Sequence, residues 1–263
     1  MRSLILVVLA LAASTAFGAP APSACQAQSP AHAVALVELY TSEGCSSCPP
    51  ADRWLRELPV QATDQLPVVP LALHVDYWNS IGWTDRFSNH AYTDRQNWLS
   101  GLAHSHVIYT PEVFVNGHEV REWSDGSVLR LAQTALGQPA PAAVTLSEHQ
   151  NPDGTYQAKA TIDRIQGKHG AVALVVAFYE NNVTSVVKAG ENSGATLRHG
   201  FATLALSSPV KVEDGKATAT LSGHLPAGAK TEDLGFVAFA EDVDNGDILE
   251  AVALSACTAQ AQN

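Results

Sequence analysis

The sequence predicts two domains of different fold class, an α/β domain followed by an all-β sandwich domain. Between residues 34 and 136, strand-type runs alternate with helix-type runs, which is typical of a sheet covered by helices. A Gly-Gln-Pro-Ala-Pro segment at 137–141 has the composition of a linker. After it come short β-type runs, and no useful helical periodicity is found there. The predicted domains are residues 32–137 and 142–258.

The elements of the first domain follow from periodicity and turn residues. The segment 34–40 is an apolar strand, and apolar residues at i, i+3, i+4 and i+7 from Ala51 predict a helix that ends before Pro59. A continuous apolar run predicts a strand buried on both faces at 66–75. The remaining elements are a loop at 77–86, a helix at 88–103, a hairpin around Asn116-Gly117 and a helix at 127–136.

The second domain is predicted from runs rich in apolar and β-branched residues, separated by Gly, Asn, Asp and Pro. This pattern favours an antiparallel β-sandwich. The runs cover 144–147, 156–165, 172–179, 201–206, 217–221 and 236–240.

Composition limits the possible functions. The 263 residues are 46% hydrophobic and 16% charged, which suits a packed globular protein. The formal net charge of −11 argues against nucleic acid, whose partners present a basic face, and against an anionic membrane surface.

The N-terminus predicts export. Arg2 precedes a short apolar run and small residues, so residues 1–19 are interpreted as a removed signal peptide. The run is shorter than the ~20 residues that a membrane-spanning helix needs, and no later segment is apolar enough. We therefore expect a periplasmic or secreted protein without a membrane span. Residues 19–31, rich in Ala, Pro, Ser and Gln, are expected to form a loose arm.

Cys45 and Cys48 are the leading candidate site, because they follow the first strand as Cys-Ser-Ser-Cys and precede a helix. The dipole at a helix N-terminus favours a thiolate, which is the attacking species in disulfide exchange. We assign Cys45 as the nucleophile and Cys48 as the residue that resolves the mixed disulfide.

Two other interpretations of this pair stay open. The dithiol together with a histidine such as His74 could carry copper, because thiolates and imidazole both suit that metal. The pair could also be a permanent structural disulfide. A four-ligand zinc site is not favoured, since no second Cys/His pair occurs at short spacing.

The other two cysteines, Cys25 and Cys257, lie near the two ends of the mature chain. In an oxidising compartment they are expected to form a structural disulfide. Both could instead be free, or Cys25 could be a lipidated N-terminus.

Three aromatic residues are candidates for substrate binding. Tyr77, Trp78 and Trp83 belong to the loop that follows the second strand. They could form an apolar ledge beside the dithiol, or they could simply pack over a helix.

Three segments together resemble a bacterial secreted thioredoxin-like family that is known mainly by a domain-of-unknown-function label. They are residues 37–52 around the dithiol, His-Val-Asp-Tyr-Trp-Asn at 74–79, and Tyr-Thr-Pro-Glu-Val-Phe-Val-Asn-Gly at 109–117. The resemblance implies a thioredoxin-like fold for the first domain.

The resemblance also implies roles for three residues. Pro111 matches a cis-proline that lies against the cysteine pair, and the Thr110 backbone would pair with a bound peptide. Glu38 matches a buried acid that accepts the proton of the resolving cysteine, although its spacing to Cys45 is one residue longer than usual.

The sequence therefore predicts an exported thiol–disulfide oxidoreductase. Its partners would be protein thiols or disulfides of the cell envelope, together with an unknown redox partner. No bound cofactor or metal is required, since the electrons pass through the cysteines. The alternative is a non-enzymatic module that binds or delivers copper with the same cysteines.

Overall fold

The computed structural model describes residues 25–59, 68–105 and 107–257, and they form a β-rich fold. Strands make up 43% of the chain and helices 19%. The helices are α1 (Pro49–Glu57), α2 (His90–Leu102), α3 (Ser127–Leu136), and the 3-10 helices η1 (Tyr77–Ile81), η2 (Trp123–Asp125) and η3 (Thr231–Asp233). The strands are β1 (Cys25–Gln28), β2 (Ala35–Thr41), β3 (Val68–His74), β4 (Glu112–Val115), β5 (His118–Glu119), β6 (Ala142–Gln150), β7 (Thr155–Ile165), β8 (Val172–Glu180), β9 (Val183–Val186), β10 (Thr196–His199), β11 (Ala202–Leu206), β12 (Val210–Lys211), β13 (Ala217–His224), β14 (Leu234–Asp242) and β15 (Ile248–Ser255).

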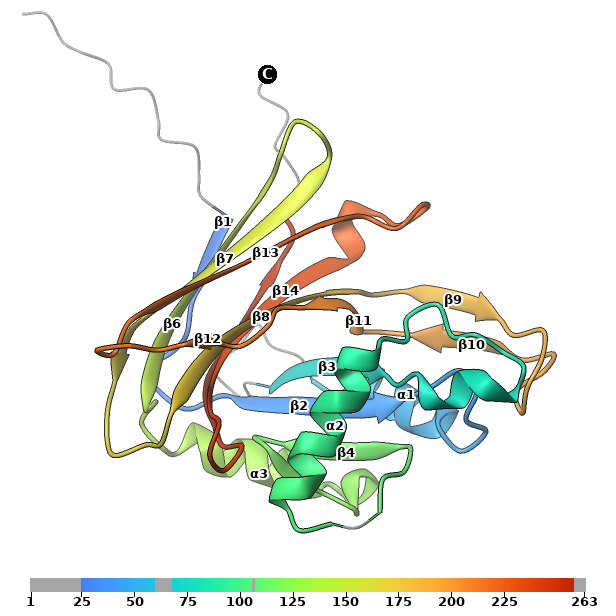
Figure 1. The fold of residues 1–263 in the computed structure, drawn as a ribbon, viewed down its shortest axis with the longest axis horizontal. Helices are drawn as coiled ribbons and strands as arrows, with labels where there is room; N and C mark the ends of the chain where they lie inside the picture. The colour runs from blue at the N-terminus through green and yellow to red at the C-terminus, as the bar shows by residue number, and fades with distance from the viewer. Residues whose placement is uncertain (1–24, 60–67, 106, 258–263) are drawn as a thin grey trace, which may run out of the picture.

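The predicted fold class, an α/β thioredoxin-like domain followed by an all-β sandwich, is wrong. Strands from both sides of the 137–141 segment join one nine-stranded sheet, in the order β15-β14-β8-β11-β3-β2-β4-β5, with β12 also paired to β8 (Figure 1). The two halves meet where β11 runs parallel to β3, and there the Ala72 amide donates to the Phe201 carbonyl at 2.8 Å. The result is a large mixed sheet with few helices.

The first helices lie on opposite faces of this sheet. Successive side chains of a strand point to opposite faces. On β2, Glu38 contacts Arg95 of α2, whereas Thr41, three residues on, contacts Asp52 of α1. Helix α1 therefore covers one face at β2 and α2 covers the other.

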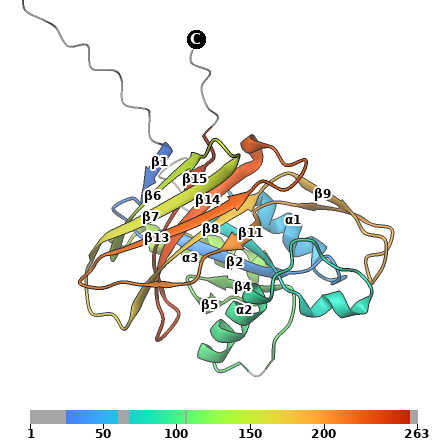
Figure 2. The same cartoon turned by 45° about the horizontal axis from the view of Figure 1, so that its top comes forward.

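Strands β8 and β14 separate two hydrophobic cores. Every residue of both strands is buried. On β8, Val175 and Ala177 belong to the core that includes the helices, whereas Leu174 and Val176 belong to a second core. The second core fills the space under a four-stranded sheet, in the order β1-β6-β7-β13, which lies across β8 and β14 (Figure 2). Both halves of the chain thus share one body.

Two turns that lie far apart in the sequence touch each other. Asn116 and Gly117 have φ values of 49° and 85°, as an Asn-Gly hairpin turn requires. A Cβ atom on Gly117 would lie 1.9 Å from the Gly246 carbonyl oxygen, so only glycine fits where the turn between β4 and β5 meets the turn between β14 and β15.

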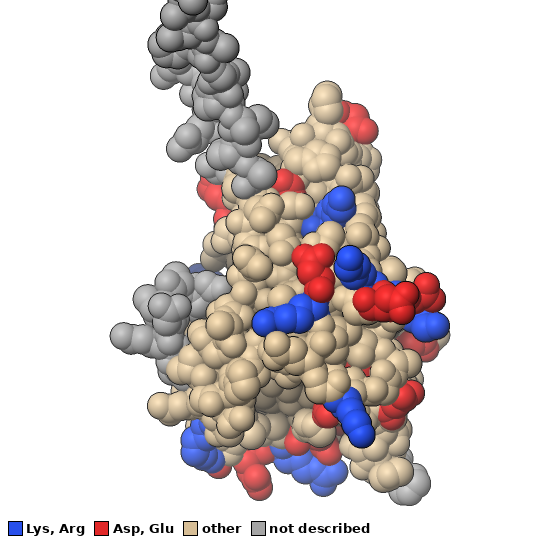
Figure 3. All heavy atoms as spheres, turned by 90° about the vertical axis from the view of Figure 1, so that its left-hand side faces the viewer, with Lys and Arg blue, Asp and Glu red and all other residues tan. Residues whose placement is uncertain are grey.

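Cys25 and Cys257 form a disulfide that joins β1 to the segment after β15. Residues 25–28, expected in a loose arm, instead pair with β6 as strand β1. The predicted signal peptide, residues 1–19, lies outside the described residues. No helix among the described residues is long and apolar enough to cross a membrane. On the face shown in Figure 3, acidic and basic side chains are interspersed.

Candidate functional site

Cys45 and Cys48 form a disulfide at the point where β2 gives way to α1. Cys48 is the N-cap residue of α1, and Pro49 follows at the first helical position, where a missing N–H is tolerated. The turn before the disulfide is held by its own backbone, because the Cys45 amide donates to the Ser42 carbonyl at 3.1 Å. The disulfide is thus positioned at a helix N-terminus.

The loop that carries Thr110 and Pro111 lies against this disulfide. The peptide bond between them is cis. The Thr110 carbonyl oxygen lies 3.7 Å from the Cys45 sulfur and 3.4 Å from the Ser47 hydroxyl. Ser47 Oγ is itself 3.4 Å from the Cys45 sulfur, so its hydroxyl can donate to a thiolate there. The structure therefore brings Cys45, Cys48, Thr110 and Pro111 together.

Both cysteines are fully buried, with an exposed fraction of 0%. Trp78 lies over the turn, where it packs against Gly44 and donates its indole N–H to the Thr110 hydroxyl at 2.8 Å. Attack on the disulfide therefore requires these covering groups to move.

A loop between β9 and β10, from the second half of the chain, also contacts the cysteine turn. The amide of Ser46 donates to the Glu191 carboxylate at 3.0 Å. The Asn192 side chain donates to the carbonyls of Glu43 and Cys45, both at 2.9 Å. These contacts fix the cysteine turn to a segment that is almost 150 residues away in the sequence.

Of the three aromatic residues expected to form a ledge, Trp78 and Trp83 contact the cysteine turn, and each of the three is anchored by a polar contact. Besides the Trp78 contact with Thr110, the Trp83 indole donates to Glu43 at 2.6 Å. Tyr77 is partly exposed and donates to Gln96 at 3.3 Å, and burial raises the pKa of Tyr77 to about 12.

Glu38 lies in a different cluster, on the face of β2 opposite to α1. Its carboxylate accepts from Arg95 Nε at 2.6 Å and from the Tyr40 hydroxyl at 3.3 Å. Arg95 also donates to Glu241 of β14 at 2.8 Å. Glu38, which was expected to take the proton of Cys48, therefore belongs to a buried ion-pair network with Arg95 and Glu241.

A buried cluster of acids and histidines on the α1 side was missed by the sequence analysis. His74 Nδ1 lies 2.7 Å from Asp85, and His199 lies 3.2 Å from Glu43 and 3.7 Å from Asp52. The two imidazole rings are 5.0 Å apart. His199 belongs to the second half of the chain, so no local pattern in the sequence links it to the cysteines.

Burial and neighbouring charges shift the pKa values of this cluster in different directions. Burial raises the pKa of Asp52 above its usual value. Burial alone would lower the pKa of His74, but Asp85, Asp52 and Glu43 together raise it. Burial also opposes the ionisation of Asp85, but His74 and two backbone amides bring the pKa of that carboxyl down to about 2.

Asp52 belongs to helix α1, which carries Cys48 at its N-cap. It lies four residues after Cys48 on α1, and residues at this spacing share a helix face. Asp52 Oδ2 is the oxygen that lies 3.7 Å from His199, and Oδ1 accepts from the Thr41 hydroxyl at 2.8 Å. The contact with Thr41 fixes the carboxyl toward β2. The position i+4 from the second cysteine is the signal in the sequence that could have identified it.

The family of the chain is shown by a match to the model of a protein family of unknown function, DUF1223, over residues 36–241. The chain belongs to this family. A family of unknown function was predicted from the motifs, and that part of the prediction is confirmed. No curated protein is significantly similar to the chain.

Two solved structures share the fold of this DUF1223 protein. A protein from Agrobacterium tumefaciens is 28% identical, with a TM-score of 0.61, and the alignment covers 88% of this chain and 98% of that one. HBP35 of Porphyromonas gingivalis is 18% identical, with a TM-score of 0.64, and the alignment covers 89% of this chain and 80% of that one. The second likeness concerns the fold alone.

Proposed function

We propose that this DUF1223 protein exchanges its Cys45–Cys48 disulfide with thiols of other proteins outside the cytoplasm. The observation that carries the proposal is the disulfide at the N-terminus of α1, in contact with the Thr110 carbonyl. Two disulfides, together with the expected signal peptide, suit an oxidising compartment.

The exchange has two steps. A partner thiolate attacks the Cys45 sulfur, the Cys45–Cys48 bond breaks, and Cys48 leaves as a thiolate. Asp52, which burial keeps protonated to a higher pH, supplies a proton to Cys48. A second partner thiolate then attacks the partner's sulfur in the mixed disulfide, and Cys45 leaves as a thiolate that accepts from the Ser47 hydroxyl. The partner is oxidised by two electrons and the dithiol is reduced; the reverse sequence reduces a partner disulfide.

Access to the sulfurs is part of this proposal. Because both cysteines are fully buried, Trp78 or the loop carrying Glu191 and Asn192 moves before the partner attacks. Once Trp78 moves away, the Thr110 backbone and the neighbouring aromatic rings are left to receive an extended segment of the partner. Complete burial also suits the competing interpretation, a permanent structural disulfide.

A copper site finds less support in the geometry. Among the described residues, the one group of three potential ligands close enough to hold an ion is Cys25, Glu148 and Cys257, whose cysteines are joined to each other. His74 does not form such a group with Cys45 and Cys48, and its Nδ1 already contacts Asp85.

Trapping experiments test the proposal. In Cys48→Ser the free Cys45 thiolate can attack a partner disulfide, as in the reverse sequence, but Cys48 is absent and cannot resolve the mixed disulfide, so partner proteins should be captured and released by dithiothreitol. Cys45→Ser is the matched control, since it lacks the nucleophile and should capture few partners. Equal capture by both variants, or none by either, would support the structural disulfide instead.

A further inference from the structure

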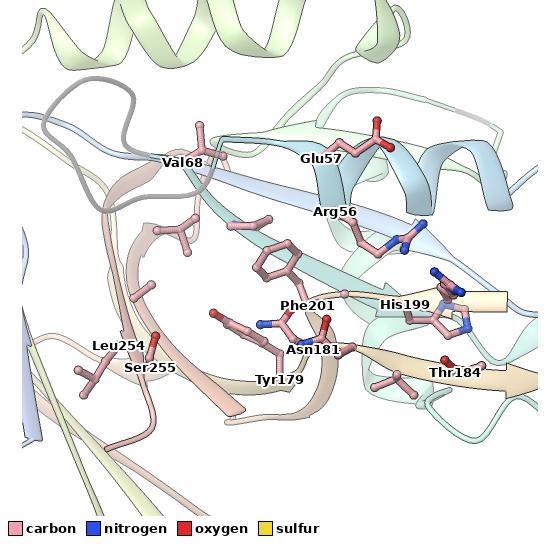
Figure 4. A pocket seen from close by; sticks show the side chains of 17 residues that line it. Arg56, Glu57, Val68, Tyr179, Asn181, Thr184, His199, Phe201, Leu254 and Ser255 are labelled. Carbon is pink, nitrogen blue, oxygen red and sulfur yellow. Dashed lines mark hydrogen bonds between the residues drawn. The ribbon is translucent and has the colours of Figure 1, made fainter. Parts of the chain in front are cut away.

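A cavity of about 800 Å³ opens beside α1 (Figure 4), and neither Cys45 nor Cys48 lines it. Its walls come from both halves of the chain: α1 and β3 from the first, and β8, β9, β10 and β15 from the second. A smaller cavity of about 470 Å³ shares Arg56, Glu57 and Arg198 with it and adds Asp52 and Arg53. The volume suits a small organic molecule.

One end of the cavity is cationic, although the chain carries a net charge of −11. Arg56 and Arg198 both line it, and neither takes part in a salt bridge with the described residues. Arg56 Nε is buried and has no hydrogen-bond partner in the described part of the chain. In Figure 4 the carboxylate of Glu57 points away from Asn181 and Tyr179. Glu57 also lines the cavity, but neither arginine forms a salt bridge with it in the described structure, so both guanidinium groups can contact an anion.

The packing of Arg56 shows that this end of the cavity is built. Its side-chain stem lies over Gly200, where a Cβ atom would be only 2.7 Å from Arg56 Cγ. In Figure 4 the guanidinium extends from there toward His199. The Asn181 side chain holds the same segment, because its oxygen accepts from the Phe201 amide at 2.9 Å.

The other end of the cavity is apolar. Val68 and Pro70 of β3, Phe201 and Leu254 line it. The rings of Tyr179 and Phe201 meet edge to face with centroids 5.3 Å apart. Among the described residues, this end offers an apolar surface for a hydrocarbon or aromatic body.

We infer that this cavity binds a small organic anion with an apolar body, whose carboxylate or phosphate contacts Arg56 and Arg198 and whose body lies against Phe201 and Val68. Guanidinium groups bind both anions through paired hydrogen bonds. The inference does not depend on the disulfide chemistry, because none of the residues that bind the anion contacts Cys45 or Cys48 in the described structure.

Calorimetric titration of the mature full-length chain tests the inference. The probes are acetate, octanoate, 4-phenylbutyrate, phenyl phosphate and the neutral 4-phenylbutan-1-ol. We expect saturable one-to-one binding of the amphipathic anions, at least about tenfold tighter than that of acetate or of the alcohol. Arg198→Met and Arg56→Met should each weaken binding by roughly tenfold or more.

Arg164→Met is the matched control, because Arg164 is exposed on β7 and lines neither cavity; it should bind as the wild type does. Arg198 is exposed as well, so its substitution should leave folding intact even if Arg56→Met does not fold. The inference is overturned if the alcohol binds as tightly as 4-phenylbutyrate, or if Arg198→Met binds like the wild type. It is also overturned if no anion of the panel binds at concentrations on the order of 10 mM.

Discussion

Arg95 is the residue whose removal most directly tests how the two halves of the sheet are held together. Its side chain is 7% exposed and pairs with Glu38 of β2 and Glu241 of β14, both 1% exposed. Arg95→Met keeps the apolar stem and leaves two buried carboxylates without their cation. Removing one partner of a buried ion pair costs about 3–5 kcal/mol, so we expect a loss of folding stability of that size at pH 7.

The loss should depend on pH in a defined direction. Burial already raises the pKa of Glu241, and without the guanidinium this carboxyl in the folded variant loses the charge that opposes the rise. The folded variant then binds more protons than the unfolded chain, so its stability falls as the pH rises through this window. The difference from the wild type should therefore shrink toward pH 4. Adding Glu38→Gln and Glu241→Gln to Arg95→Met should restore much of the stability at pH 7.

Urea unfolding, followed by circular dichroism at pH 4.5 and pH 7, measures these effects. The wild type should unfold in one transition, because Arg95 and the shared core tie α2 and β2 to β14. A loss below about 1 kcal/mol at pH 7, or the same loss at both pH values, would contradict a buried ion-pair network.

Three further predictions concern the cysteines and their surroundings. Trp78→Ala should speed reduction of Cys45–Cys48 by dithiothreitol at least about tenfold, equivalent to 1.4 kcal/mol, measured by alkylation and mass spectrometry; an unchanged rate would exclude Trp78 as a cover. Asp52→Asn should be more stable than the wild type at pH 7, because the raised pKa of Asp52 makes its ionisation destabilising above pH 4. The same substitution should slow disulfide exchange. Unfolding curves of variant and wild type that coincide at both pH 4 and pH 7 would refute the stability prediction. Replacing Cys25 and Cys257 by Ser should lower stability by roughly 2–5 kcal/mol in urea and leave the reduction rate of Cys45–Cys48 unchanged; a slowed reduction would show that the terminal disulfide acts on the site.

The sequence predicted many elements but not how they assemble. Helices α1, α2 and α3 and strands β2 and β3 lie where periodicity and Pro or Gly residues placed them. The fold class was wrong because the pairing of β11 with β3 joins segments 130 residues apart and leaves no local signal. A signal did exist in β8 and β14, whose continuous apolar runs indicate burial on both faces. A strand of an isolated sandwich would alternate between apolar and polar residues, as β6 does in its burial.

The candidate site was predictable where its residues are local. The Cys45–Cys48 turn, Thr110 and Trp78 carry turn, proline and aromatic signals, and the structure places them together. Glu38 was assigned by analogy, but a sequence does not tell which face of β2 each helix covers. His199 was out of reach, because it arrives beside the cysteine turn through the pairing of β10 with β9.

The reduction potential of the Cys45–Cys48 disulfide tests the central claim most directly. Equilibration of the folded protein with glutathione buffers, followed by alkylation of free thiols, measures it. A disulfide that exchanges with protein thiols should titrate between about −270 and −120 mV, whereas a structural disulfide titrates below about −300 mV. A potential below about −300 mV, with Cys45 resistant to alkylation in the Trp78→Ala variant as well, would contradict the account.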